Sequence, residues 1–179
     1  MRIKIVFALN FLLLLNACNE SGLSSDAKKI YDNRQELMQR FSNVDVWRRG
    51  DSAFLLHIYN GEKANRYLFK GNNGLKLQRD TIQFRLSEIE RFKNVDTINQ
   101  NTGVRDLLIE LLNSMDALNI REISNDRMRL GINPEFFLNK GGVVFFVRDL
   151  SLVTNPVWQN YIKESKVIGE NWYYRSKKQ

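Results

Sequence analysis

The chain has 179 residues, of which 43% are hydrophobic and 26% are charged, as expected for one globular domain. It contains 2 prolines and 10 glycines, which excludes the collagen-like and the Pro/Gly-rich disordered classes. One cysteine and one histidine exclude an internal disulfide, a cysteine-based zinc site and a multi-histidine metal site, so we expect no cofactor. The net charge of +7 favours anionic partners.

The beginning of the chain has the composition of a secretory signal. Arg2 and Lys4 precede a run from Ile5 to Leu15 that is apolar except for one asparagine. As a helix this run would be about 16 Å long, which is too short to span a bilayer. The run ends in Leu15-Asn16-Ala17-Cys18, which contains the only cysteine of the chain.

This ending resembles the lipobox of bacterial lipoproteins, in which an aliphatic residue and two further residues, the second of them small, precede a cysteine. The resemblance covers residues 1–18 and departs from the family pattern at Asn16. It implies a signal peptide over 1–17, a lipid on Cys18 and a membrane-anchored protein of the bacterial cell envelope. Because Asn19 rather than aspartate follows the cysteine, the resemblance favours the outer membrane over the inner one.

The rest of the chain predicts a short tether and one domain. Residues 18–25 are mostly polar and are expected to link the lipid to a single globular domain over 26–179. Apolar residues at helical spacing predict a first helix from Asp26 to Ser42, capped by Ser24 or Ser25.

An antiparallel meander of four or five strands is expected next. Apolar and polar side chains alternate with a period of two, and Asn60-Gly61 and Gly71–Gly74 supply turn signals. The expected strand segments are Val44–Trp47, Phe54–Tyr59, Arg66–Lys70, Leu75–Leu77 and Ile82–Leu86.

The second half of the chain predicts a long helix, further strands and a short helix. Thr102 to Leu118 has a wide apolar stripe, which favours a helix that packs across the sheet. The unbroken apolar run Val143–Val147 predicts a central strand that is buried on both faces. The other expected elements are strands at Ile120–Ser124, Arg127–Ile132 and Lys166–Arg175 and a short helix that begins at Asn155-Pro156. The predicted fold class is α+β, with two longer helices and one short helix packed on one face of an antiparallel sheet.

The phase of the meander places four basic side chains on the face away from the core, namely Arg66, Lys70, Lys76 and Arg85. Such a face would suit an acidic protein, an acidic polysaccharide or anionic headgroups. The alternative is a solvated surface whose cations prevent edge-to-edge association. No nucleic acid is expected, because the predicted location is outside the cytoplasm and no RNA-binding motif occurs.

Signatures of catalysis are weak in this sequence. His57 has no partner visible in the sequence, and the simplest interpretation is a histidine on the less apolar face of a strand. A hydrolase that uses two carboxylates would have to rely on Glu88 with Glu90, or on Asp149 at the end of the buried strand. Each of these acids lies beside an arginine, so ordinary surface pairing is the alternative.

The sequence therefore predicts a lipid-anchored, non-enzymatic binding or structural domain, of which an immunity or inhibitor protein is a narrower version. The expected partners are the membrane, through the lipid on Cys18, and a protein or an anionic envelope polymer. The alternative hypothesis is an envelope hydrolase that uses carboxylates as acid and base. We assign no catalytic residue and no metal ligand.

Overall fold

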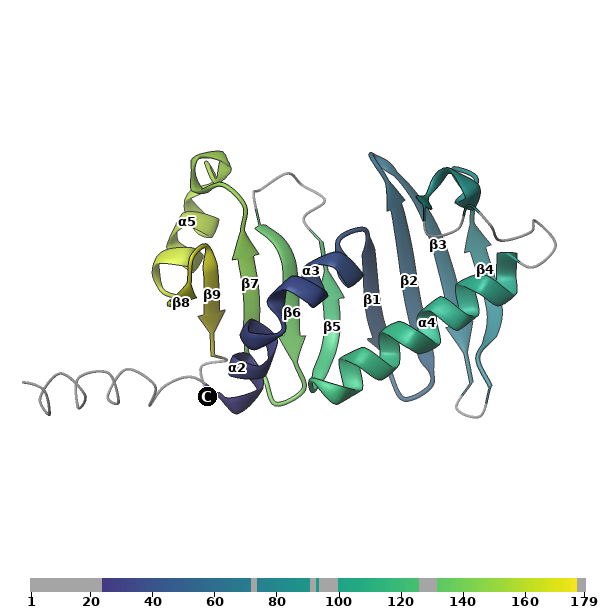
Figure 1. Cartoon of the computed structure of the whole chain (residues 1–179), viewed down its shortest axis with the longest axis horizontal. Helices are drawn as coiled ribbons and strands as arrows, with labels where there is room; N and C mark the ends of the chain where they lie inside the picture. Colours follow the sequence, from purple (N-terminus) through teal and green to yellow (C-terminus); the bar gives the residue numbers. More distant parts are fainter. Residues whose placement is uncertain (1–23, 72–73, 91–92, 94–99, 126–131, 177–179) are drawn as a thin grey trace, which may run out of the picture.

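The computed structural model describes residues 24–71, 74–90, 93, 100–125 and 132–176, which form a nine-stranded antiparallel sheet with helices (Figure 1). The expected α+β class is confirmed. The strands are β1 Val44–Arg49, β2 Ala53–Asn60, β3 Lys63–Lys70, β4 Lys76–Thr81, β5 Ile120–Ser124, β6 Ile132–Leu138, β7 Val143–Val147, β8 Lys166–Gly169 and β9 Trp172–Arg175. The helices are α2 Ser25–Asp32, α3 Arg34–Phe41, α4 Gln100–Ala117 and α5 Pro156–Lys163, with short 3-10 helices η1 Leu86–Glu88 and η4 Leu150–Leu152.

The sheet consists of two meanders, β1 to β4 and β5 to β7, that run outward from a central pair of strands (Figure 1). The β8–β9 hairpin extends the second meander out of chain order, because β9 rather than β8 pairs with β7. The sheet order is β4-β3-β2-β1-β5-β6-β7-β9-β8, and β1 pairs with β5 so that Val46 lies opposite Ile123. Helices α2 and α3 precede the first meander and α4 precedes the second. Nevertheless, α2 contacts β7 and α4 contacts β4, so each helix reaches the meander that it does not precede. This cross-packing joins the two halves in one domain.

The main core lies between the sheet and helices α2, α3 and α4. Each helix buries apolar side chains that recur at helical spacing. In α4, for example, Leu108 and Met115 are fully buried. Phe136 of β6 lies at the centre of a group of rings, with its centroid 6.3 Å from the rings of both Phe41 and Trp172. Full burial of each such side chain contributes roughly 1.5–3 kcal/mol.

The expected first helix is two helices, which meet at Asn33. The side chain of Ser24 accepts a hydrogen bond from the Ala27 backbone N–H, 3.1 Å away, which confirms it as the cap of α2. The side-chain amide of Asn33 donates to the Lys29 carbonyl at 2.8 Å, and its backbone N–H donates to the same oxygen at 3.1 Å. Asparagine side chains compete for backbone groups in this way, and here they end one helix before the next begins.

The expected fifth strand of the meander, Ile82–Leu86, is wrong. The backbone of this segment hydrogen-bonds to the side chain of the fully buried Asn65 on β3, and not to the backbone of a neighbouring strand. The Asn65 Oδ1 accepts from the N–H groups of Gln83 and Phe84 at 2.7 and 3.2 Å, and its Nδ2 donates to the Phe84 carbonyl at 3.0 Å. These three hydrogen bonds turn the chain so that Phe84 and Leu86 enter the core.

One other strand prediction needs correction, and another is largely untested. The segment Lys166–Arg175 is a hairpin of β8 and β9 rather than one strand, with Asn171 at a φ of 60° in its turn. Of the expected strand Arg127–Ile132, residues 127–131 lie outside the described residues. The strand of this region, β6, begins at Ile132. It contains Pro134, and because proline is rare inside strands, the sequence pattern does not indicate β6.

The expected packing of all helices on one face is wrong for the short helix, because α5 packs on the opposite face of the sheet from α2, α3 and α4. Alternate side chains of β7 and β9 therefore point to opposite faces of the sheet and belong to two different hydrophobic clusters. Val144 and Trp172 belong to the main core, whereas Phe145 and Tyr173 belong to a second cluster with Ile162 of α5. Strand β7 is thus buried on both faces, as predicted. We use the term open face for the sheet face opposite α2, α3 and α4 over strands β1 to β6; in the described residues, α5 covers only the adjoining part over β7 and β9.

Candidate functional site

The sheet register aligns one row of side chains across the open face. Pairing between neighbouring strands places in this row Arg79, Leu68, Leu55, Trp47, Glu122 and Phe137. Leu68, Leu55 and Trp47 are half-buried and directly adjacent, and we call these three residues the apolar stripe. Opposed side chains on one face of an antiparallel pair are in contact range, so the stripe is a continuous apolar surface.

Three of the four predicted basic residues lie together beside the apolar stripe. Arg66 and Lys70 lie four residues apart on β3 and therefore share a face, and Lys76 of β4 is opposite Lys70. All three are exposed, and we call them the basic group. Arg85 is not part of it, because this residue precedes η1 outside the sheet, where its backbone N–H donates to Glu88 Oε1 at 3.1 Å.

A fully buried carboxylate, Asp45 of β1, also lies on the open face. It accepts a hydrogen bond from the Tyr59 hydroxyl and another, 2.7 Å long, from the Asn125 backbone N–H. The Asn125 side-chain amide lies 3.3 Å from the same carboxylate and donates to the carbonyls of Phe41 and Val44 at 3.0 and 2.6 Å. A buried charge is tolerated only with such donors, and here they connect β1 to the end of β5.

His57 of β2 lies beside this carboxylate. Its Nδ1 is 3.3 Å from the Tyr59 hydroxyl and 4.0 Å from Asp45 Oδ2, and its ring packs edge-on against Trp47 with centroids 4.6 Å apart. Burial is the larger cause and the charge of Arg66 the smaller one of a His57 pKa that is lowered from 6.5 to about 4. The imidazole is therefore neutral near pH 7. Burial also raises the pKa of Tyr59 above its ordinary value, so the hydroxyl keeps its proton.

The sequence contained one signal for this cluster that the sequence analysis did not use. Asp45 stands between two valines in a strand, where a charged residue needs a specific partner if it is buried. Alternation had placed His57 and Tyr59 on one face, and that phase is correct. The register that sets Asp45 opposite His57 belongs to the tertiary structure.

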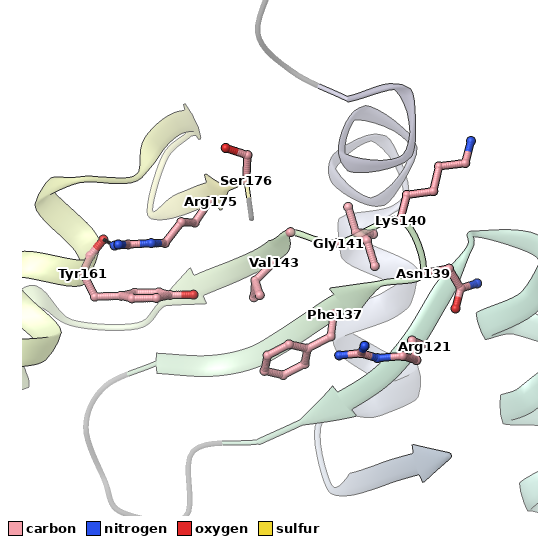
Figure 2. Close-up of a pocket in the computed structure, with 11 residues that line it drawn as sticks. Arg121, Phe137, Asn139, Lys140, Gly141, Val143, Tyr161, Arg175 and Ser176 are labelled. Atoms are coloured by element: carbon pink, nitrogen blue, oxygen red, sulfur yellow. Dashed lines mark hydrogen bonds between the residues drawn. The ribbon is translucent and has the colours of Figure 1, made fainter. Parts of the chain in front are cut away.

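A cavity of about 490 Å³ lies at one end of the open face, next to the β6–β7 turn (Figure 2). Figure 2 shows the Arg121 guanidinium and the Tyr161 hydroxyl pointing toward it from opposite sides, with Phe137 and Val143 between them. Lys140 is at the rim and points outward. No acidic residue lines the cavity within the described residues. The cavity therefore combines cations, a hydroxyl and apolar side chains.

The wall of this cavity is held by specific contacts. The Arg175 guanidinium lies 4.4 Å from the centroid of the Tyr161 ring, donates to the Tyr161 carbonyl at 3.0 Å and pairs with Glu164 at 2.7 Å. Gly142 has a φ of 102°, and a side chain there would place its β carbon 3.1 Å from both the Arg175 carbonyl oxygen and the Tyr174 ring. Only glycine fits this turn without strain.

The carboxylates that a hydrolase would need have local partners. Glu90 pairs with Lys93, and Glu88 belongs to η1 and accepts the hydrogen bond from Arg85. Asp149 is exposed and accepts from the Ser151 hydroxyl at 2.7 Å and from its backbone N–H at 2.8 Å, and these hydrogen bonds lower the Asp149 pKa. A general acid needs a raised pKa, so the Asp149 environment is the opposite of the one required.

Cys18 lies outside the described residues. Within those residues, no group of three or more histidine, cysteine, aspartate and glutamate side chains is placed to hold a metal ion. No helix in the described segments is both long enough and apolar enough to cross a membrane. No protein-family model, curated protein or solved structure matches the chain.

Proposed function

We propose that the chain is a lipid-anchored binding domain of a bacterial cell envelope, held in the outer membrane through Cys18, and that its open face binds an acidic protein. The sequence Leu15 to Cys18, with its resemblance to a lipobox, supports the anchor. Two acyl chains bind a bilayer stably, whereas one chain binds only marginally. With such an anchor, the open face does not have to bind the membrane and can bind a protein.

The observation that carries the binding proposal is the apolar stripe beside the basic group. Protein interfaces typically have an apolar, aromatic centre surrounded by a polar rim, and tryptophan and arginine are enriched among the residues that contribute most. The apolar stripe contains Trp47, and the basic group adds three exposed cations next to it. Complementary charge speeds association and selects partners, so the partner expected for this surface is acidic.

The placement of the carboxylates favours binding over the hydrolase alternative. Two acids that cooperate in hydrolysis lie about 5–10 Å apart on either side of one substrate. Glu90 and Asp149 instead have local partners at separate surface positions, and the cavity beside the β6–β7 turn has no acidic lining among the described residues. The carboxylate of Asp45 is fully buried and already accepts hydrogen bonds from the Tyr59 hydroxyl and from the backbone and side-chain N–H groups of Asn125.

An immunity or inhibitor protein is the narrower version of this proposal. In that version the acidic partner would be an exported toxin or hydrolase, and the open face would cover its active surface. The identity of the partner decides between this version and a scaffold role.

The first experiment is crosslinking of the tagged chain in its native envelope, followed by capture and mass spectrometry. A single protein that is recovered in near-stoichiometric amount, and whose contact surface is acidic, is the expected result. Recovery of envelope polymer alone would contradict the choice of a protein partner.

A pair of charge-reversal variants then tests the surface. Lys70→Glu with Lys76→Glu should weaken binding of the captured partner about tenfold or more, because both cations flank the apolar stripe. We leave Arg66 unchanged because its charge acts on His57. The matched control is Lys29→Glu with Arg105→Glu, which changes the net charge equally on exposed positions of α2 and α4. Equal affinities of the two double variants would refute the role of the basic group.

A further inference from the structure

The cavity beside the β6–β7 turn lies at the same end of the molecule as the start of α2. The Asn119 side-chain amide donates to Asp26 Oδ1 in the first turn of α2 at 2.9 Å. The Asn119 carbonyl accepts from the backbone N–H of Asn139, also at 2.9 Å, and Asn139 lines the cavity. Two hydrogen bonds thus join the start of the helix to the wall of the cavity. In Figure 1, α2 lies close to the ends of β6 and β9 that border this cavity.

This end of the domain lies near the membrane if Cys18 carries the lipid, so the inference rests on that part of the proposed function. Ser24, the cap of α2, lies six residues after Cys18. Six fully extended residues span at most about 20 Å. The first turn of α2, and the cavity wall that is hydrogen-bonded to it, are therefore held close to the headgroup layer.

The polar side chains that point into the cavity fit an oxyanion. Arg121 is the extra residue where the register of β5 and β6 shifts, and such bulges redirect a side chain. Its guanidinium presents a fork of donors that matches phosphate geometry. Tyr161 lies opposite Arg121. Its burial, and to a smaller extent the charge of Glu135, raise the pKa of Tyr161, so the hydroxyl keeps its proton and remains a donor. The lining contains three cations, Arg121, Lys140 and Arg175, of which Arg175 already pairs with Glu164.

The lining also contains apolar side chains, which distinguishes this cavity from a site for a small inorganic ion. Val143 and Phe137 are half-buried and lie between the two polar groups (Figure 2). The volume of about 490 Å³ falls in the range of sites for small organic molecules. A ligand with one phosphate and an adjoining apolar portion would use both parts of the cavity.

We propose that this cavity binds the phosphate of an anionic lipid headgroup, in a phosphodiester such as phosphatidylglycerol, from the membrane that holds the anchor. Arg121 and the Tyr161 hydroxyl bind the phosphate, and Val143 and Phe137 contact the glycerol and the first carbons of the chains. Bound in this way, the headgroup fixes the orientation of the domain at the membrane, with the cavity end toward the bilayer.

The test is isothermal titration calorimetry of the full-length chain, purified in an uncharged detergent. The probes are dihexanoyl phosphatidylglycerol, dihexanoyl phosphatidylcholine and glycerol 3-phosphate. Phosphatidylglycerol should bind at least tenfold more tightly than phosphatidylcholine, because the cations of the lining repel the choline group. It should also bind at least tenfold more tightly than glycerol 3-phosphate, which lacks the chains that contact Val143 and Phe137. Arg121→Glu should weaken this binding at least tenfold, and Tyr161→Phe, which keeps the ring against Arg175, should weaken it about threefold to fivefold.

A matched control separates the cavity from the overall charge of the protein. Lys70→Glu makes the same charge change on the basic group and should leave phosphatidylglycerol binding unchanged. Because Arg121 and Lys70 are both exposed, thermal unfolding of each variant should match that of the parent chain. Equal weakening by Arg121→Glu and Lys70→Glu would show a general charge effect and overturn the site.

Two further results would also overturn the proposal. Equal binding of the two lipids would exclude recognition of anionic headgroups. Binding of glycerol 3-phosphate as tight as that of the lipid would show that the source of the phosphate is soluble. Intact-mass analysis of the same sample reports whether Cys18 carries lipid, so a failure of the anchor is distinguished from a failure of the cavity.

Discussion

Replacement of Asp45 by alanine tests the buried cluster that organises the centre of the open face. The change removes the acceptor of the hydrogen bonds from the Tyr59 hydroxyl and from the Asn125 backbone N–H. The Asn125 N–H then remains where water has little access, since Asp45 is fully buried and Asn125 is 7% exposed. The hydroxyl of the half-buried Tyr59 loses its acceptor as well. The variant should therefore be strongly destabilised.

The expected magnitude follows from these two hydrogen bonds. Each bond to a charged acceptor contributes roughly 1.5–3 kcal/mol. Part of this loss is offset because the variant no longer has to bury a carboxylate. We expect a net loss of about 3 kcal/mol in the free energy of unfolding, which is a large part of the roughly 5–15 kcal/mol of an ordinary domain.

The assay is equilibrium unfolding in urea, with far-UV circular dichroism as the signal. With a slope of about 2 kcal/mol per molar urea, the midpoint should fall by about 1.5 M. Asp51→Ala, in the exposed turn before β2, is the matched control and should change stability by less than about 0.5 kcal/mol. A midpoint shift below about 0.3 M for Asp45→Ala would refute the reasoning.

A double-mutant cycle gives an independent check of the same contact. Tyr59→Phe removes one donor to Asp45 and should cost about 1.5 kcal/mol or more by itself. In the Asp45→Ala background the same change should cost almost nothing, because the hydroxyl no longer has its partner. Additive effects of the two substitutions would mean that the hydroxyl and the carboxylate do not interact.

Three further predictions concern pH, the cavity wall and the anchor. His57 has a pKa of about 4 when folded and 6.5 when unfolded, so the unfolded chain binds more protons between these values and stability should fall as the pH drops from about 6.5 to 4. Across this pH range His57 should account for a loss of about 3 kcal/mol in the free energy of unfolding, and His57→Gln should remove this loss. Identical pH profiles of stability for the parent chain and the variant would contradict this. Gly142→Ala should lower stability by about 1–3 kcal/mol, measured as a lower melting temperature, because its φ of 102° and the nearby Arg175 carbonyl leave no room for a side chain; an unchanged melting temperature would contradict that strain. Cys18→Ala should abolish metabolic labelling with palmitate, and undiminished labelling would rule out the lipid anchor.

Local patterns in the sequence predicted much of the sheet and the phase of its side chains. Period-two alternation located β1, β2 and β3, and it placed Arg66, Lys70 and Lys76 on the face that points away from the helices. These features depend on neighbours within a few residues, because the alternation of a strand is a property of its own backbone. Turn residues such as Asn60-Gly61 separated the strands for the same reason.

Predictions failed where a distant residue decides the local conformation. The segment Ile82–Leu86 has the alternation of a strand, yet Asn65 binds its backbone and directs it into the core. Likewise, nothing in the sequence of α5 indicates which face of the sheet it covers. By contrast, the division of the first helix at Asn33 is local, because the Asn33 side-chain amide donates to the Lys29 carbonyl only four residues earlier.

Local sequence patterns were sufficient to predict the α+β class, the positions of most elements and the side of the sheet that carries the basic group. The resemblance that points to Cys18 is likewise a local pattern. Only the tertiary structure brought Asp45 to His57, and only it assembled the cavity from Arg121, Tyr161 and Arg175. The physical reason is that strand register and the packing of distant segments create these contacts. A shift of one residue in register would turn each strand's side chains to the other face, and no local periodicity specifies which partner strand supplies the opposing residue.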